Sequence, residues 1–216
     1  MLLAVSVPAV VASVGQRFVQ TSRGYVTFRL HRVFDVHAGP SSRHDDLVLE
    51  GVFSNATLVS VRIVSDTIGG KAQTPDEIAT AEEEWVHPKS GDAFHAPFDP
   101  RYFGEYSYRA QPVRSAITFT SVVSDGGHGS GSFSYDRKYD VTSYTYEPSV
   151  MPQYAKTGTV SGTRAGVLPG YWAITQETQQ YQGHYALWNG GATTQYTWSD
   201  FRRFGTLAEA ERAIGR

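Results

Sequence analysis

The feature that most limits the fold of this chain is an alternation of apolar and polar residues interrupted by a glycine-rich loop. Residues 116–123 are mostly β-branched or aromatic, and apolar side chains such as Phe119 recur on one face. The loop at 124–131 supplies the glycines that a reversal of chain direction needs. Alternation then resumes at Phe133 and Tyr135. The whole stretch, AITFTSVVSDGGHGSGSFSYD, therefore predicts a β-hairpin.

The same alternation recurs along most of the chain, with short turns between the segments. We expect about ten or eleven strands, at 25–36, 47–53, 58–65, 102–111, 116–123, 133–136, 139–146, 158–164, 171–177, 181–188 and 193–201. Such regular spacing is typical of antiparallel sandwiches and barrels. The pattern predicts a mainly β fold, with one large curved antiparallel sheet that forms an open half-barrel and short helices covering its concave face.

Two helix signals interrupt the strands. Thr74 precedes a proline and lies three residues before Glu77, which is a capping-box start, so we expect an inserted helix near 75–84. A second capping box at Thr206 predicts a C-terminal helix near 207–214. The inserted helix either plugs one end of the core or acts as a lid.

The N-terminal stretch at 2–14 is apolar and uncharged, and it is shorter than the roughly 20 residues that span a bilayer. It resembles the apolar centre of a secretory signal with a cut after Ala12, without the positively charged start. The alternative is a buried N-terminal strand or helix. We therefore divide the chain into 1–19, a signal-peptide remnant or N-terminal segment, and 20–216, a single domain. Export would place the protein in the periplasm.

Composition narrows the function. The 216 residues suit one large β domain, and 40% hydrophobic with 19% charged residues argue against disorder. A net charge of −2 without a basic stripe makes nucleic acid a poor partner. The chain has no cysteine, so disulfides and thiolate metal sites are excluded.

Four loop residues are the best metal-ligand types available: His95, Asp99, Asp125 and His128. Their spacing would allow a site of two histidines and two carboxylates if the loops met. The stronger interpretation is structural, because Asp125 begins a turn and Asp99 precedes a proline. We therefore predict no metal and no cofactor.

Other catalytic signals are weak. The glycine loop is followed by a strand, whereas a phosphate cradle needs a helix N-terminus or a comparable nest of N–H groups. Glu105, Asp136 and Glu147 are generic candidates for a pair of glycoside-cleaving carboxylates. No serine lies in a GxSxG motif. We predict that the protein is not an enzyme.

Aromatic side chains recur on many of the predicted strands and would line the concave face. The candidate ligand-binding residues are Phe28, Phe53, Phe119, Phe133, Tyr135, Trp172, Tyr185 and Trp188. Two short helices would leave part of such a face uncovered, and the remainder would be an apolar cleft suited to acyl chains. The alternative is that helices and loops cover the whole face and make it core.

Four segments resemble landmarks of a group of bacterial exported proteins: APFDPRYFGEYSY at 96–108, SDGGHGSGSFSYD at 124–136, VLPGYWA at 167–173 and FRRF at 201–204. Together with the hairpins and the inserted helix, they make the chain similar to the LolA/LolB-like superfamily of periplasmic lipoprotein carriers. The resemblance implies an unclosed half-barrel with a helical lid over a cavity for acyl chains. The long N-terminal helix of that superfamily is not evident here, and the lipidated cysteine of its outer-membrane member is absent.

These observations predict non-enzymatic binding or carriage of a lipid or another apolar ligand in the bacterial cell envelope. One alternative is a metal-dependent hydrolase built on the loop histidines and aspartates. The other is an envelope interaction module whose exposed sheet edges pair with a partner protein.

Overall fold

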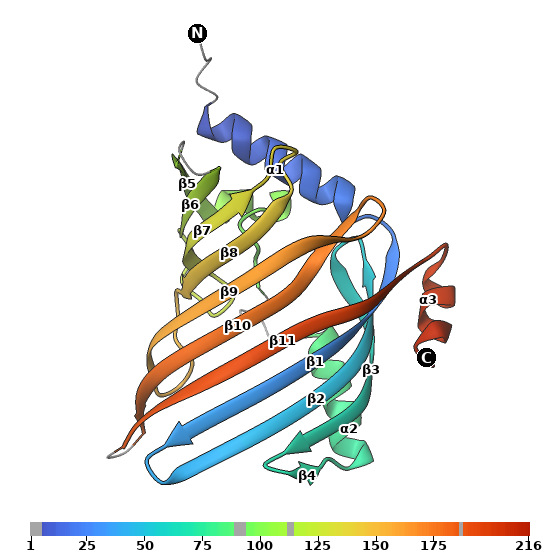
Figure 1. Ribbon diagram of the computed structural model, residues 1–216, viewed down its shortest axis with the longest axis vertical. Coiled ribbons are helices and arrows are strands. Elements are labelled where there is room, and N and C mark those ends of the chain that lie inside the picture. The colour runs from blue at the N-terminus through green and yellow to red at the C-terminus, as the bar shows by residue number, and fades with distance from the viewer. Residues whose placement is uncertain (1–5, 89–93, 112–114, 186–187) are drawn as a thin grey trace.

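In the computed structural model, which describes residues 6–88, 94–111, 115–185 and 188–216, one antiparallel sheet of eleven strands dominates the fold (Figure 1). Its spatial order is β4-β3-β2-β1-β11-β10-β9-β8-β7-β6-β5, and the sheet is not closed. The strands are β1 (Tyr25–Ala38), β2 (Ser41–Ser54), β3 (Thr57–Ile68), β4 (Lys71–Ala72), β5 (Tyr106–Gln111), β6 (Ala116–Ser121), β7 (Gly129–Tyr135), β8 (Val141–Pro148), β9 (Ala155–Leu168), β10 (Tyr171–Tyr185) and β11 (Trp188–Phe204). The predicted fold class is confirmed, and eleven strands are present, but the segments predicted at 171–177 and 181–188 form the single strand β10, and β4 was not predicted.

The sheet consists of two meanders, β1–β4 and β5–β11, joined by pairing of β1 with β11 along nearly their full lengths. The hairpin predicted at 116–136 is present as β6 and β7, with Phe119 opposite Gly131. The turn between β2 and β3 has positive φ at both Asn55 and Ala56, as a two-residue hairpin turn requires.

The N-terminal helix α1 (Val7–Thr21) corrects the expectation that no such helix precedes the first strand. Val10, Val11 and Val14 bury one side of α1 in the core. Arg17 also donates two hydrogen bonds of 2.9 Å to Asp140, whose side chain is 2% exposed. The valine-rich sequence of α1 has low intrinsic helix propensity, so packing against the core stabilises the helix. Export, with removal of this stretch, stays a prediction.

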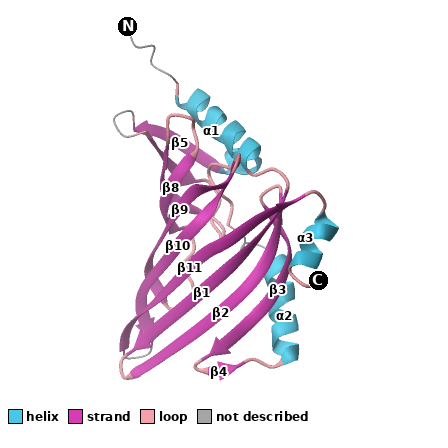
Figure 2. Ribbon diagram, turned by 45° about the vertical axis from the view of Figure 1, so that its right-hand side comes forward, coloured by secondary structure: helices cyan, strands magenta, loops and turns pink. Residues whose placement is uncertain are grey.

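Both predicted capping-box helices are present. Helix α2 (Pro75–Val86) begins after Thr74, and α3 (Leu207–Ala213) begins after Thr206. They lie on opposite faces of the sheet, on either side of β3 (Figure 2). Helix α2 packs over Leu49 and its neighbours, whereas α3 packs against Val52. Alternate residues of a strand point to opposite faces, so of these two helices α2 covers the face of Leu49 and α3 covers the other. The expectation that α3 covers the concave face is wrong.

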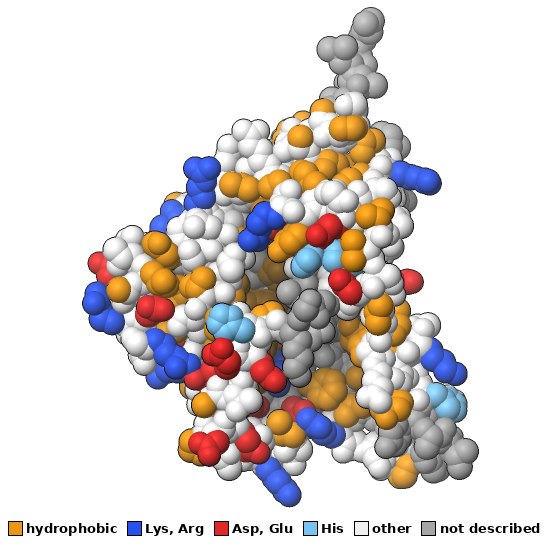
Figure 3. Space-filling model, turned by 180° about the vertical axis from the view of Figure 1, so that it is seen from behind, with side chains coloured by type: hydrophobic (Ala, Val, Ile, Leu, Met, Phe, Trp, Pro, Cys, Tyr) orange, Lys and Arg blue, Asp and Glu red, His pale blue; other side chains and the backbone are white. Residues whose placement is uncertain are grey.

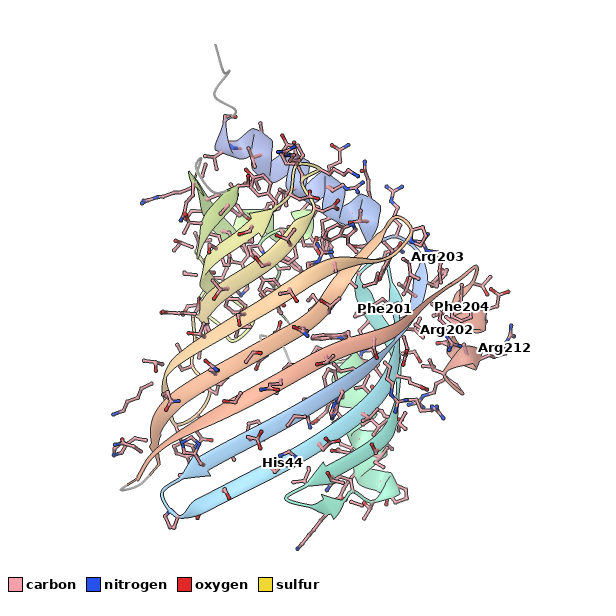
Figure 4. The ribbon with its side chains drawn as sticks, viewed as in Figure 1. His44, Phe201, Arg202, Arg203, Phe204 and Arg212 are labelled. Carbon is pink, nitrogen blue, oxygen red and sulfur yellow. The ribbon has the colours of Figure 1, made fainter. Side chains whose placement is uncertain are left out.

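We call the face that carries Leu49 the inner face. Pairing register extends it across the sheet, because Leu49 lies opposite Leu30, which lies opposite Trp198. The FRRF segment at the end of β11 spans both faces (Figure 4). Phe201 packs with the residues beneath α2, and Phe204 packs with α3 on the outer face.

A 3-10 helix, η1 (Pro100–Glu105), precedes β5, so the strand predicted at 102–111 begins only at Tyr106. Asp99 caps η1 by accepting a hydrogen bond from the Arg101 backbone N–H at 3.0 Å. Among the described residues, no helix is long and apolar enough to cross a membrane.

Two packed groups occupy the inner face. The α1 cluster comprises Val10, Val11, Val14, Phe98, Tyr106, Ile117, Phe119, Phe133, Val141, Tyr144, Tyr146 and Val160. The α2 cluster comprises Phe28, Leu30, Leu47, Leu49, Val61 and Ile63, with Phe53, Leu58, Ile78, Ala81, Trp85, Val86, Tyr196, Trp198 and Phe201 packed around them.

Candidate functional site

A pocket of about 480 Å³ lies between the α1 cluster and the α2 cluster. Aromatic side chains from both helices, from η1 and the loop before it, and from several strands form a large part of its wall. These residues are Phe18, Phe53, Trp85, Phe94, Phe98, Tyr102, Tyr171, Trp172 and Trp198. Seen from behind, apolar side chains lie at the bottom of a hollow near the middle of the molecule (Figure 3).

The wall on the α2 side rests on stacked rings. Phe53 stacks on Phe28 with ring centroids 4.4 Å apart, and Trp198 stacks on Tyr196 at 5.7 Å. Phe28 is 3% exposed, so the ring beneath Phe53 belongs to the packed core. Trp85 comes from α2, none of whose residues is buried. The strands thus supply a firm floor, and α2 supplies a more exposed side wall.

Arg164 is a buried cation in this apolar wall. It is 6% exposed, and its guanidinium lies 4.9 Å from the Phe18 ring centroid and 5.4 Å from that of Phe98. Its Nη2 donates a hydrogen bond of 3.1 Å to the Trp172 carbonyl. Burial lowers the pKa of Arg164 to about 10, so the group remains charged at neutral pH. Within the described part of the chain, no carboxylate lies within ion-pair distance of it.

The other arginine of the wall is neutralised. Arg101 donates from Nε and Nη2 to Asp99 Oδ2, at 2.9 and 2.6 Å. Its Nη1 also donates to Thr57 Oγ1 at 3.1 Å. The hydrogen bond to Asp99 raises the pKa of Arg101. Asp99, a candidate metal ligand by sequence, is therefore occupied in capping η1 and holding Arg101.

Of the eight aromatic residues expected to bind ligand, Phe53 and Trp172 line the pocket. Phe28 lies directly beneath Phe53. Phe119 and Phe133 are 2% and 1% exposed and stack on each other at 6.1 Å inside the α1 cluster, so they are core.

Tyr135 stacks on Tyr139 at 5.8 Å, at the margin of the α1 cluster and outside the pocket wall. Tyr185 and Trp188 pair with each other where β10 and β11 meet, and their side chains lie outside the described part of the structure. The wall residues that sequence reasoning missed include Trp85, Trp198 and Arg164. Trp198 was detectable, because it alternates with Tyr196 on a predicted strand.

Three of the candidate metal ligands meet beside η1 and the glycine loop. His128 Nε2 and His95 Nδ1 each lie 2.8 Å from Glu105 Oε2, and His128 Nδ1 lies 2.5 Å from Asp125 Oδ1. The sequence indicates Glu105 only as a generic candidate for a glycoside-cleaving carboxylate, not as a metal ligand. Asp99, a candidate metal ligand by sequence, lies outside this cluster. Burial by itself would lower the pKa of His128, but the two carboxylates raise it above its ordinary value.

A buried carboxyl group lies farther along the inner face. Glu177 is opposite Gly162 in the β9–β10 register, and it accepts hydrogen bonds from the Tyr144 hydroxyl and, at 2.9 Å, from Gln179 Nε2. Burial raises the pKa of Glu177 despite these two donors. The inner face therefore changes from apolar to polar beyond the pocket.

No protein-family model and no curated protein sequence matches the chain. Among solved structures, it is similar to a LolA superfamily protein from Nitrosomonas europaea, with 8% identity, a TM-score of 0.43, and coverage of 95% of this chain and 97% of the other. A putative outer membrane lipoprotein-sorting protein domain from Vibrio parahaemolyticus matches with 11% identity, a TM-score of 0.46, and coverage of 95% and 98%.

Lipovitellin also matches, with 8% identity and a TM-score of 0.44 over 86% of this chain and 26% of that protein. These likenesses are of overall shape, at 8–11% identity.

Proposed function

We propose that the protein is a non-enzymatic binder or carrier of a lipid or another amphiphile, held in the pocket between the α1 and α2 clusters. The observation that carries this proposal is the pocket itself, about 480 Å³ with a wall rich in aromatic and aliphatic side chains. That volume falls within the roughly 300–1,000 Å³ of small-molecule sites, and an apolar wall with a few polar groups is their usual make-up. An alkyl or acyl chain is the ligand class that such a wall favours.

Arg164 supports a ligand whose head group is anionic. A guanidinium that lies against two rings without a carboxylate in ion-pair contact is costly to bury, and a bound carboxylate or phosphate would offset that cost. The backbone carbonyl of Trp172 holds Nη2 in place, which orients the planar group. We therefore expect a fatty acid or an anionic lipid to bind more tightly than an uncharged analogue.

Pocket filling tests the proposal. Leu58 lines the pocket near the start of β3, and Leu58→Trp should reduce the affinity for oleate at least 10-fold, measured by calorimetry below the micelle concentration. Val64→Trp is the matched control, because Val64 lies on the same strand and is 44% exposed. If oleate does not bind the unaltered protein, or binds both variants equally, the pocket is not a lipid site.

The head-group expectation has its own test. Oleate should bind at least 10-fold more weakly to Arg164→Gln than to the unaltered protein, whereas oleyl alcohol should bind both alike. Equal losses for the two ligands would show that Arg164 acts only by shaping the pocket.

We also propose a location in the bacterial cell envelope, supported by the apolar stretch at 2–14. Fractionation of the native host would test it, because a cytoplasmic pool alone would contradict the proposal. The intact mass of the exported protein would also show whether Val10 and Val11 remain to pack in the α1 cluster.

The β4 edge of the sheet is poorly suited to pairing with a partner strand. Edge strand β4 has two residues, and Lys71 in it is exposed. Short edges with charged side chains are a usual protection against pairing with other chains. A partner captured equally well by the Leu58→Trp variant would favour the interaction module instead.

A further inference from the structure

A second cluster of side chains, separate from the pocket wall, has the composition of a metal site. Glu105 ends η1, His128 lies in the glycine loop just before β7, and His95 lies in the loop before η1. Their ligand-type atoms, His95 Nδ1, His128 Nε2 and a Glu105 carboxylate oxygen, all lie within 4.8 Å of one another. Two imidazoles and one carboxylate form a donor set typical of zinc and related ions.

The histidines are already oriented for binding. The Asp125 carboxylate accepts from the Gly127 backbone N–H at 2.9 Å and faces His128 Nδ1 at 2.5 Å. This contact keeps a proton on Nδ1, so Nε2, which faces Glu105, is the nitrogen available to a metal ion. A carboxylate on the far nitrogen of a metal-binding histidine is the usual orienting group, and it makes the ligand more basic.

His95 is held just as firmly. Its ring stacks on Tyr102 at 4.1 Å, and its backbone N–H donates to the Gly127 carbonyl at 3.0 Å. The Tyr106 hydroxyl donates to the His95 carbonyl. Three separate chain segments therefore present their donors to one point without rearrangement.

The spacing of the three groups also suits a cation at this point. Glu105 Oε2 faces a nitrogen of each imidazole at 2.8 Å, and His128 is 1% exposed. A divalent ion at the centre would bind all three groups at once.

We propose that His95 Nδ1, His128 Nε2 and the Glu105 carboxylate bind a divalent transition-metal ion of the zinc class, with Asp125 as the positioning residue for His128. The side chains of His95 and Glu105 are 28% and 32% exposed, so solvent reaches the site and water completes the coordination. By binding His95, Glu105 and His128, the ion would link the loop that carries Phe94 and Phe98 to the end of η1 and to the glycine loop. This site stands on its own geometry, whatever ligand the pocket takes.

The test is titration of chelator-treated protein with zinc chloride, followed by calorimetry and elemental analysis. We expect one ion per chain and a rise in melting temperature that grows with free zinc. Cobalt(II), used as a spectroscopic probe, should show the visible absorption of a four-coordinate site.

Variants separate this site from adventitious binding. His95→Ala and Glu105→Gln change partly exposed residues and should each abolish stoichiometric binding, and Asp125→Asn should weaken it about 10–100-fold. His44→Ala is the matched control, because His44 lies in β2 next to Asp35 in an exposed pair (Figure 4). No stoichiometric zinc, or binding that survives Glu105→Gln or disappears in His44→Ala, would overturn the proposal.

Discussion

The α1 cluster and the α2 cluster lie on the same inner face and contain the same kinds of side chain, but the helices that cover them pack differently. Helix α1 buries three valines and forms an ion pair with a buried aspartate, so the strands beneath it form closed core. Helix α2 has no buried residue, and the pocket opens next to it. The helix above a strand therefore determines whether an aromatic side chain of that strand is buried in the core or lines the pocket.

A charged side chain introduced beneath each helix should lower the free energy of unfolding by very different amounts. Val14→Asp puts a carboxylate at a position that is 0% exposed, and it should cost about 4 kcal/mol or more of unfolding free energy. Ile78→Asp on the half-buried face of α2 should cost about 1 kcal/mol. Urea denaturation would measure both, and similar losses would show that α2 is packed as firmly as α1.

Removing one phenylalanine ring from each region should also affect the two regions differently. Phe133→Ala should destabilise the protein by about 3–5 kcal/mol, whereas Phe53→Ala, at the pocket wall, should cost roughly half as much. Ligand affinity should respond in the opposite order, with the larger loss in Phe53→Ala. Oleate affinity per folded molecule is the quantity to compare, and a greater loss in Phe133→Ala would mean that the binding site lies in the α1 cluster.

The ion pair that holds α1 gives a smaller effect. Arg17→Met leaves the buried Asp140 without its main partner and should cost about 1–3 kcal/mol. The control is His87→Ala at the end of α2, where His87 and Glu83 are 70% and 75% exposed and their pairing contributes little. Thermal unfolding of the two variants should differ clearly, and equal shifts would contradict the assigned anchoring of α1.

The polar part of the inner face adds a pH dependence. The pKa of Glu177 is raised in the folded protein, so folding favours its protonated form. Its ionisation therefore destabilises the fold as pH rises through the folded pKa, and this cost is absent below the unfolded pKa. Glu177→Gln should raise the melting temperature at pH 8 and have little effect at pH 4. An equal effect at both pH values would indicate a packing change instead.

The strands and the capped helices were predictable because their signals are local. Alternation indicates a strand, and Thr74 with Glu77 encodes a helix start within four residues. A buried helix at the N-terminus was only the alternative to a secretory signal, because valines have low intrinsic helix propensity and α1 is stabilised by distant contacts such as that of Arg17 with Asp140.

The sites were predictable only in part for the same reason. Phe53 and Phe119 look alike in the sequence, and only the position of the covering helix separates wall from core. Glu105 meets His95 and His128 across 10 and 23 residues, through a 3-10 turn that no alternation reveals.

The central claim is that the opening next to α2 holds an acyl chain among aromatic rings, and tryptophan fluorescence tests it directly. Trp85, Trp172 and Trp198 line the pocket, and Trp188→Phe removes the fourth tryptophan of the chain. Dibromostearate quenches indole emission on contact, so it should quench this variant saturably, whereas stearate should compete without quenching. The same titration with Leu58→Trp added should show a much weaker response. Emission that dibromostearate leaves unchanged, or that stearate cannot restore, would contradict a lipid in this pocket.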